Sequence, residues 1–166
     1  MSDQSLTRDL IAGAAAGAVA TWVMGALTTA LYEREDAGAR RVEDQARHGE
    51  TSYGTAAKKL ARLAGRQLSA DDSERYGKAI HWAIGLGTGA LYGALRPRLS
   101  AASLAGGALF GTLVWLLIDE GANTALRLTP GPTAFPWQTH ARGLAAHLAY
   151  GTVANAALAA VGQTTH

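Results

Sequence analysis

The chain has 166 residues, which leaves room for one domain and excludes an elaborate multidomain enzyme. Only 17% of the residues are Asp, Glu, Lys or Arg, whereas 48% are hydrophobic and 20 are glycine, and this balance is typical of a membrane protein. The absence of cysteine excludes disulfide scaffolds and thiolate sites, and the small formal charge of +2, without a basic stripe interleaved with aromatic residues, argues against a nucleic-acid partner.

Four stretches of the chain have uncharged cores that are each long enough to cross a lipid bilayer. With their flanks, they predict transmembrane helices at about residues 10–32, 76–95, 99–120 and 143–162. A water-soluble four-helix bundle is the alternative, but its helices would need charged outer faces, and no Lys, Arg, Asp or Glu in these cores supplies one. The sequence therefore predicts an all-α fold, a polytopic membrane protein whose single domain is a four-transmembrane-helix bundle.

The first stretch has a second interpretation, a cleaved signal peptide. Its leader carries Asp3 and Asp9 against a single Arg8, whereas a signal peptide begins with a positively charged segment. Residues 10–32 also exceed the apolar segment of a signal peptide, which is roughly 7 to 15 residues long. A retained helix is therefore favoured.

A charged segment, residues 33–75, connects the first two spans. Within it, residues 54–68 predict an amphipathic surface helix, because apolar residues recur at three- and four-residue spacing while cationic residues follow another face. The apolar positions are Ala57, Leu60, Ala64 and Leu68, and the cationic positions are Lys58, Arg62 and Arg66. Such a helix can lie on anionic lipid headgroups or pack over the end of the bundle, and the pattern supports both equally. Ser69 followed by Asp72 forms a capping box, which predicts that the second long helix begins near Ala70.

The cationic residues are distributed unequally between the two sides of the predicted bundle. The side of the first loop carries twelve Lys and Arg residues, whereas the opposite side carries Arg8, Arg96 and Arg98. By the positive-inside rule, the first loop is cytoplasmic and both termini lie outside. The opposite orientation stays open, because Arg96 and Arg98 occupy a very short loop, where charges count most.

Small residues recur every four positions in all four spans. This spacing allows two helix backbones to approach closely in a membrane, so it predicts a tightly packed bundle. The glycines concerned are Gly13 and Gly17 in the first span, Gly85, Gly89 and Gly93 in the second, Gly107 and Gly111 in the third, and Gly151 in the fourth. The same seams would also suit a second copy of the chain or another membrane subunit. The second and fourth spans share a histidine and a glycine, His81/His147 and Gly85/Gly151, at an offset of 66 residues, which is compatible with two pseudo-repeated helical hairpins.

Three polar side chains, His81, His147 and Asn155, lie inside predicted spans, where a polar residue normally faces protein or a water-filled cavity. The two histidines lie at a similar depth below the same face of the bundle. The third span ends at that face with Asp119 and Glu120. The sequence therefore predicts a polar His/carboxylate cluster at one mouth of the bundle.

Several roles are open for such a cluster. Imidazoles beside carboxylates can relay protons, His81 and His147 can ligate a divalent metal, and two facing imidazoles can bind haem axially. The simplest alternative is that each histidine forms a hydrogen bond to a neighbouring helix. Neither metal nor haem is favoured over the absence of a cofactor, and no catalytic motif in the sequence supports an enzymatic activity.

Several motifs resemble a known protein family. AVATWVMG at residues 18–25 runs into LYERED and ARRVEDQARHG, AIHWAIG occupies residues 79–85, and LTPGPTAFPW at residues 128–137 precedes AHLAYG. The pattern covers most of the chain discontinuously and resembles the YagU-type bacterial inner-membrane proteins, whose function is uncharacterised, although the first loop here lacks the proline-rich stretch of some members. The most specific parts are the histidines that match His81 and His147 and the proline-rich segment. The resemblance implies a small multi-pass protein of the bacterial cytoplasmic membrane, and it transfers no catalytic or ligand residue.

Two classes of function follow from these observations. The first is a non-enzymatic binding or permeation protein whose His/carboxylate cluster handles protons or a metal, with bis-histidine haem binding as a minor alternative. The second is a structural or assembly subunit that packs through its glycine seams against another membrane protein.

Overall fold

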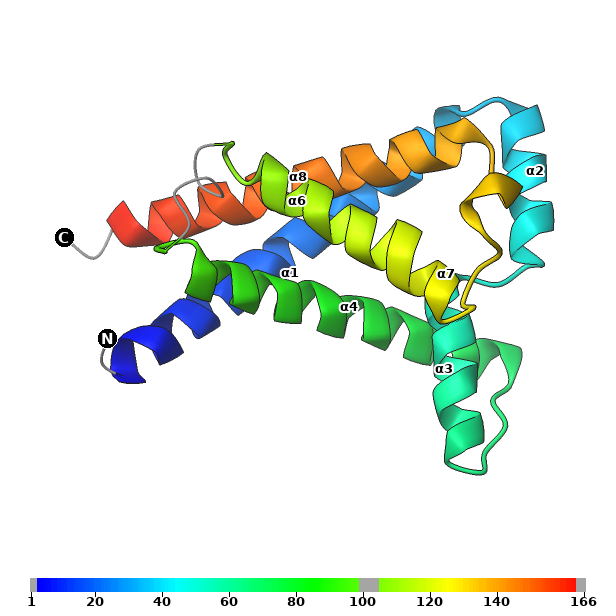
Figure 1. Cartoon of the computed structure of the whole chain (residues 1–166), viewed down its shortest axis with the longest axis horizontal. Helices are drawn as coiled ribbons and strands as arrows, with labels where there is room; N and C mark the ends of the chain where they lie inside the picture. The colour runs from blue at the N-terminus through cyan, green and yellow to red at the C-terminus, as the bar shows by residue number, and fades with distance from the viewer. Residues whose placement is uncertain (1–2, 99–104, 164–166) are drawn as a thin grey trace.

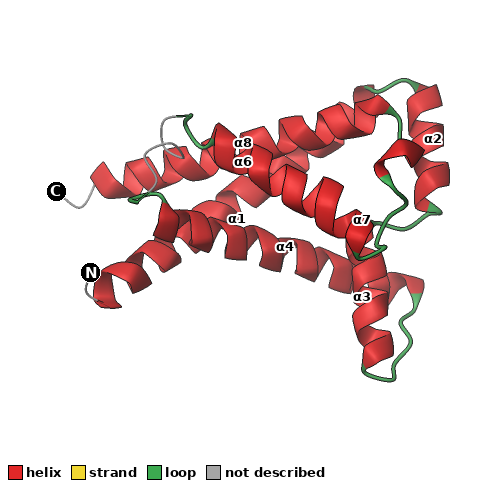
Figure 2. Cartoon of the chain, viewed as in Figure 1, coloured by secondary structure: helices red, strands yellow, loops and turns green. Residues whose placement is uncertain are grey.

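The computed structural model describes residues 3–98 and 105–163, and every regular element in these ranges is a helix (Figures 1 and 2), which confirms the all-α class. Within these ranges the bundle consists of α1 (Asp3–Arg34), α4 (Ala70–Leu95), a composite third helix and α8 (Trp137–Gln163). The composite helix is formed by α6 (Ala108–Val114), the π-helix η1 (Trp115–Ala122) and α7 (Asn123–Ala125), which follow one another without a break. Residues 99–104, the first residues expected for the third span, lie outside the described residues.

The two ends of the bundle differ in structure (Figure 1). The start of α1, the end of α4, the start of α6 and the end of α8 lie at one end. The short helices α2 (Ala37–Arg47) and α3 (Ser52–Leu63) lie at the other end, together with the segment that joins α7 to α8 and contains the 3₁₀ helix η2 (Pro132–Ala134). We call this second end the loop end.

Helix α2 has no counterpart among the sequence predictions. Its N-cap is Asp36, whose Oδ1 accepts a hydrogen bond from the backbone N–H of Ala39 at 2.9 Å. It ends at His48, which adopts a left-handed conformation with a φ of 52°. The largest apolar side chain of α2, Val42, is exposed. Hydrophobic periodicity therefore could not indicate this helix.

The surface helix expected over residues 54–68 is observed as α3, which ends before Gly65 because that residue has a φ of 72°. The first half of α3 packs on α4, where a Cβ added to Gly77 would lie 2.8 Å from the backbone nitrogen of Gly54. In the second half, the side chains of Leu60 and Leu63 are exposed. The packing over the end of the bundle that was considered for this helix therefore describes its first half, and the placement of the second half on lipid headgroups stays a prediction.

The start of α4 confirms the predicted capping box. The backbone N–H of Asp72 donates to Oγ of Ser69 at 3.1 Å, and the Ser69 hydroxyl donates to the Asp72 carboxylate at 2.9 Å. The cap satisfies a backbone donor that the first turn of a helix leaves free, so the helix begins at Ala70.

Glycines bring the long helices into backbone contact. Helix α1 packs against both α4 and α8, and α6 packs against α8. Between α1 and α4, a Cβ added to Gly89 would lie 2.5 Å from the carbonyl oxygen of Gly13 and 2.5 Å from Cα of Gly17. Between α6 and α8, a Cβ on Gly107 or Gly151 would collide with the carbonyl oxygen of the other residue. Only glycine permits such an approach.

The two helix pairs use related contacts. A Cβ added to Gly17 of α1 would lie 2.6 Å from the carbonyl oxygen of Gly85, just as Gly107 of α6 faces the carbonyl oxygen of Gly151. Gly85 and Gly151 are the glycines that the sequence offset of 66 residues relates. The other seam glycines are Gly93, which faces Asp9 and Gly13, and Gly111, which faces His147.

The core of the bundle is small, and the outer faces of its helices are apolar. The buried core consists of Ala16, Ala20, Tyr92, Tyr150, Ala154 and Leu158. Large apolar side chains also point outward from every long helix, among them Val19 in α1, Leu91 in α4, Leu113 in α6 and Val161 in α8. Two helices, α1 over Ser5–Arg34 and α8 over Trp137–Val161, are long and apolar enough to cross a membrane.

Candidate binding pocket at the loop end

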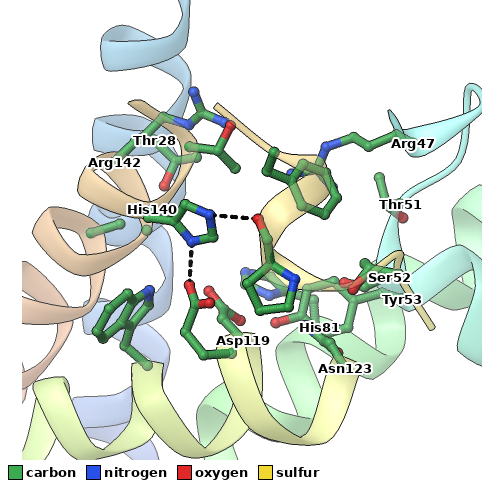
Figure 3. Close-up of a pocket in the computed structure, with 18 of the residues that line it drawn as sticks. Thr28, Arg47, Thr51, Ser52, Tyr53, His81, Asp119, Asn123, His140 and Arg142 are labelled. Atoms are coloured by element: carbon green, nitrogen blue, oxygen red, sulfur yellow. Dashed lines mark hydrogen bonds and ion pairs between the residues drawn. The ribbon is translucent and has the colours of Figure 1, made fainter. Parts of the chain in front are cut away.

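A pocket of about 370 Å³ opens at the loop end of the bundle (Figure 3). Its walls come from α1, α3, α4, the composite third helix and the start of α8, and the segment before α8 forms its rim. Three of the residues that the sequence singles out, His81, Asp119 and Glu120, line this pocket, and His147 lies behind Asp119. The structure thus brings three of these residues to one cavity and places His147 next to it.

The π-helix η1 supplies a polar wall of the pocket. In this helix the backbone N–H of Asn123 donates to the carbonyl oxygen of Ile118, five residues back instead of four. Because each turn is wider, the side chains four, five and nine positions after a given residue lie on the same face of the helix as that residue. The residues of this face that line the pocket are Trp115, Asp119, Glu120 and Thr124. In an α-helix of about 3.6 residues per turn, the first and last of these would point in opposite directions.

Glu120 pairs with His140, a residue that the sequence analysis does not single out. Nδ1 of His140 lies 2.6 Å from Oε1 of Glu120, and its Nε2 lies 3.0 Å from the carbonyl oxygen of Pro132 (Figure 3). Both ring nitrogens face acceptors, so Nε2 donates to the carbonyl oxygen of Pro132 and Nδ1 pairs with the Glu120 carboxylate. No sequence signal links the two residues, because His140 lies outside the predicted spans and beyond a proline-rich connection.

The Asp119 carboxylate is less well satisfied. Its Oδ2 lies 3.7 Å from Nδ1 of His147, which is too long for a hydrogen bond. The same Nδ1 lies 2.9 Å from the carbonyl oxygen of Gly143 and therefore donates its hydrogen there. Within the described parts of the chain, no hydrogen bond reaches the Asp119 side chain, which opens into the pocket (Figure 3).

His81 reaches the pocket from α4, and its ring centroid lies 4.9 Å from that of Tyr53. A narrow space of about 20 Å³ lies between His81 and His147, which is far too small for a porphyrin held between the two imidazoles. Over residues 3–98 and 105–163, no three His, Asp or Glu side chains are placed to hold a metal ion. A metal at these two histidines would therefore have no third protein ligand among the described side chains.

Asn155 does not join this cluster. Its Oδ1 accepts hydrogen bonds from the Tyr92 hydroxyl at 3.0 Å and from Nε of Arg96 at 2.8 Å. Asn155 lies two turns of α8 beyond His147, or about 12 Å along the helix axis. It therefore belongs to the opposite end of the bundle, and its grouping with the histidines in the sequence analysis needs this correction.

A buried ion cluster beside the pocket ties α2 to α8. Nη2 of Arg142 donates to both carboxylate oxygens of Glu43, at 2.7 and 2.6 Å, and Nη1 pairs with Glu35. Arg47 also pairs with Glu43, at 2.8 Å. Burial alone would raise the pKa of Glu43, but hydrogen bonds from Arg142 and Thr139 and the two guanidinium charges outweigh it and hold this pKa below its ordinary value.

Two further contacts hold α3 at the rim of the pocket. Lys59 donates to the carbonyl oxygen of Leu126, at 2.7 Å, and to that of the next residue, at 2.9 Å, so a cation caps the C-terminal end of α7. Glu50, just before α3, pairs with Lys58 and accepts a hydrogen bond from Ser73 of α4 at 2.7 Å. The hydrogen bond from Lys58 holds the pKa of Glu50 below its ordinary value, although burial opposes this effect.

No protein-family profile, curated protein or solved structure matches this chain. The resemblance to the YagU-type proteins therefore rests on sequence motifs alone. Two of these motifs contribute to the pocket, because AIHWAIG carries His81 and LTPGPTAFPW supplies Pro132 and Phe135 at its rim.

Proposed function

We propose that this chain is an integral membrane protein in which α1, α4, the composite third helix and α8 each cross the bilayer. The apolar side chains that all four helices expose support this proposal, because lipid would cover a surface that is unfavourable in water. Residues 76–95 of α4 measure about 30 Å along the helix axis, which matches the hydrocarbon thickness of a bilayer.

The same proposal includes kinship with the YagU-type proteins and a place in the bacterial cytoplasmic membrane, supported by the shared motifs. The loop end would face the cytoplasm, because most Lys and Arg residues lie on that side. The exposed Leu60 and Leu63 of α3, beside Lys59 and Arg62, would then rest on the headgroups of the inner leaflet.

Within this arrangement, the function is the binding of a small molecule at the loop end. The pocket is concave, and its lining combines aromatic and apolar side chains with a few converging polar groups. Its volume of about 370 Å³ falls within the usual range of small-molecule sites, roughly 300 to 1,000 Å³. This cavity is the observation that carries the proposal.

Binding is favoured over permeation because the bundle narrows beyond the pocket. The space of about 20 Å³ between the two histidines has room for about one water molecule. Deeper in the bundle, the Tyr150 hydroxyl donates to the carbonyl oxygen of Gly85 at 2.6 Å, and the rings of Tyr92 and Phe110 stack at 4.5 Å. These contacts and the glycine seams fill the helix interfaces, so we infer that the pocket is closed at its inner end and does not continue through the bundle.

A role as an assembly subunit has less support. The seam glycines pack inside the chain, where Gly13 meets Gly89 and Gly107 meets Gly151, so they are not available to a helix of another subunit. Gly25 of α1 and Gly87 of α4 have no neighbouring atom within 4 Å, but a single open glycine on a helix is not a packing seam.

The binding function is tested by filling the pocket. Thr28→Trp places a large ring in the cavity, and Thr152→Trp places the same ring on an exposed face of α8 as the matched control. The detergent-purified protein is screened by thermal shift against a panel of small molecules of mixed charge. We expect at least one compound to raise the melting temperature of the wild type and of Thr152→Trp, but not of Thr28→Trp. A wild type that responds to no compound, or equal responses in both variants, would contradict the proposal.

A further inference from the structure

The two arginines at the pocket are already neutralised. Arg142 pairs with Glu35 and Glu43, and Arg47 pairs with Glu43 from the other side. Two guanidinium groups therefore face two carboxylates, so this cluster contributes no net charge to the pocket.

One carboxylate lacks such compensation. Glu120 pairs with His140 at 2.6 Å, whereas Asp119 accepts no hydrogen bond from any described residue. Its nearest basic neighbour, His147, donates its Nδ1 hydrogen to the carbonyl oxygen of Gly143. The pocket thus contains a carboxylate that opens into its space, accepts no hydrogen bond from a described residue, and has His147, at 3.7 Å, as its nearest basic group (Figure 3).

Aromatic rings line the pocket that Asp119 faces. Trp115 lies one turn before Asp119 on the same π-helical face, and Tyr53 comes from α3. Burial raises the pKa of the Tyr53 hydroxyl, and the charge of Asp119 raises it further, so this side chain is neutral. At the rim, the guanidinium carbon of Arg47 lies 5.6 Å from the ring centroid of Phe135, so the pocket already holds one cation on an aromatic face.

We propose that this pocket binds a small organic cation, an amine or a quaternary ammonium ion, with the Asp119 carboxylate as its counter-charge and the rings of Trp115 and Tyr53 as its walls. The inference rests on the binding function proposed above and specifies the class of ligand. A ligand that fills the pocket would shield the Asp119 carboxylate, which is 31% exposed, from water, so the ligand must supply a compensating charge. Aromatic faces attract cations, so both features select the same ligand. An anion would meet Asp119 unfavourably, and the described residues offer no third ligand for a metal ion.

The test compares three compounds of nearly equal shape that differ in charge. They are choline, its neutral carbon analogue dimethylbutanol, and the anion dimethylbutanoate. Binding to the detergent-purified full chain is measured by isothermal titration calorimetry. We expect choline to bind on the order of ten-fold or more tightly than the neutral analogue, and the anion to show no saturable binding.

Asp119→Asn removes the charge while keeping the shape of the side chain. We expect the affinity for choline to fall on the order of ten-fold or more. Without ligand, this variant should melt at the same temperature as the wild type, because the Asp119 side chain is 31% exposed and accepts no hydrogen bond from a described residue. A purely structural Asp119 would instead lower the melting temperature when replaced. Asp71→Asn, at an exposed position in the first turn of α4, is the matched control and should leave the affinity unchanged.

The outcomes separate this inference from the function on which it rests. Equal binding of all three compounds, a preference for the anion, or unchanged choline affinity in Asp119→Asn would overturn the organic cation and leave pocket binding in place. If none of the three compounds showed saturable binding, the proposal that the pocket binds an organic cation would be overturned. If Thr28→Trp also altered no ligand response in the screen, the binding function would fall with it.

Discussion

Arg142 and Glu43 lie 99 positions apart in the chain, and Nη2 of the arginine donates to both oxygens of the carboxylate. Their side chains are only 6% and 3% exposed. Helix α2, which carries Glu43, buries little apolar surface of its own. This ion pair is therefore a main attachment of α2 to the bundle and to the wall of the pocket.

The first prediction concerns that attachment. Arg142→Met leaves Glu35 without its cation and Glu43 with Arg47 alone, and breaking a buried pair costs about 3 to 5 kcal/mol. We expect the backbone amides of α2 to lose their protection from hydrogen exchange. Lys78→Met, which removes an exposed pair with Glu74, should change local stability by roughly 0 to 1 kcal/mol. If α2 kept its protection in Arg142→Met, the ion pair would not be what holds it.

Acid should loosen the same end of the bundle. The folded-state pKa values of Glu43 and Glu50 lie below the ordinary value of 4.5. Their contribution to stability is therefore present above that ordinary value and is lost as the pH falls through the folded-state values. After correction for intrinsic exchange rates, we expect α2 and α3 to lose protection below about pH 4.5. The double variant Glu43→Gln with Glu50→Gln should show a weaker pH dependence, and an unchanged acid profile would contradict this linkage.

Two glycines of α4 should respond oppositely to the same substitution. Gly89→Ala places a methyl group 2.5 Å from backbone atoms of Gly13 and Gly17, so α1 and α4 must separate. We expect a loss of roughly 1 to 3 kcal/mol in the free energy of unfolding. Gly87→Ala meets no atom within 4 Å and should stabilise the helix by up to about 1 kcal/mol. Thermal denaturation in detergent measures both, and equal melting temperatures would contradict the close approach of the backbones.

The natural absence of cysteine allows a direct test of the bilayer. Val19 in α1 and Val42 in α2 are 52% and 47% exposed in the structure. In intact membranes, we expect a water-soluble maleimide to label Val42→Cys from the cytoplasmic side and to leave Val19→Cys unlabelled, because lipid covers that position. After denaturation both should react. Equal labelling of the two in native membranes would contradict the transmembrane placement of α1.

The part of the fold that could be predicted from the sequence is local or periodic. The cap at Ser69 depends on residues within one helical turn, and the glycine ladders repeat with the pitch of the helix. The common depth of His81 and His147 follows from counting residues from the ends of uncharged stretches. Such features require no knowledge of which helices are neighbours.

The remaining part of the site depends on how distant segments meet. Arg142 pairs with Glu43, and His140 pairs with Glu120. Irregular connecting segments separate the two partners of each pair in the chain, and a periodic sequence pattern does not predict where such segments lead. The alignment of Trp115 with Asp119 depends on a π-helical turn, whereas sequence patterns are interpreted with the α-helical period.

The sequence by itself determined the helical class, the apolar stretches and the small residues at the helix contacts, because each follows from hydropathy and spacing along one helix. Only the tertiary structure decided that Asn155 pairs with Arg96 and lies away from the histidines, and that Asp119 opens into the pocket beside His147. Which charges are compensated depends on contacts between helices, and these are set by the packing of the whole bundle.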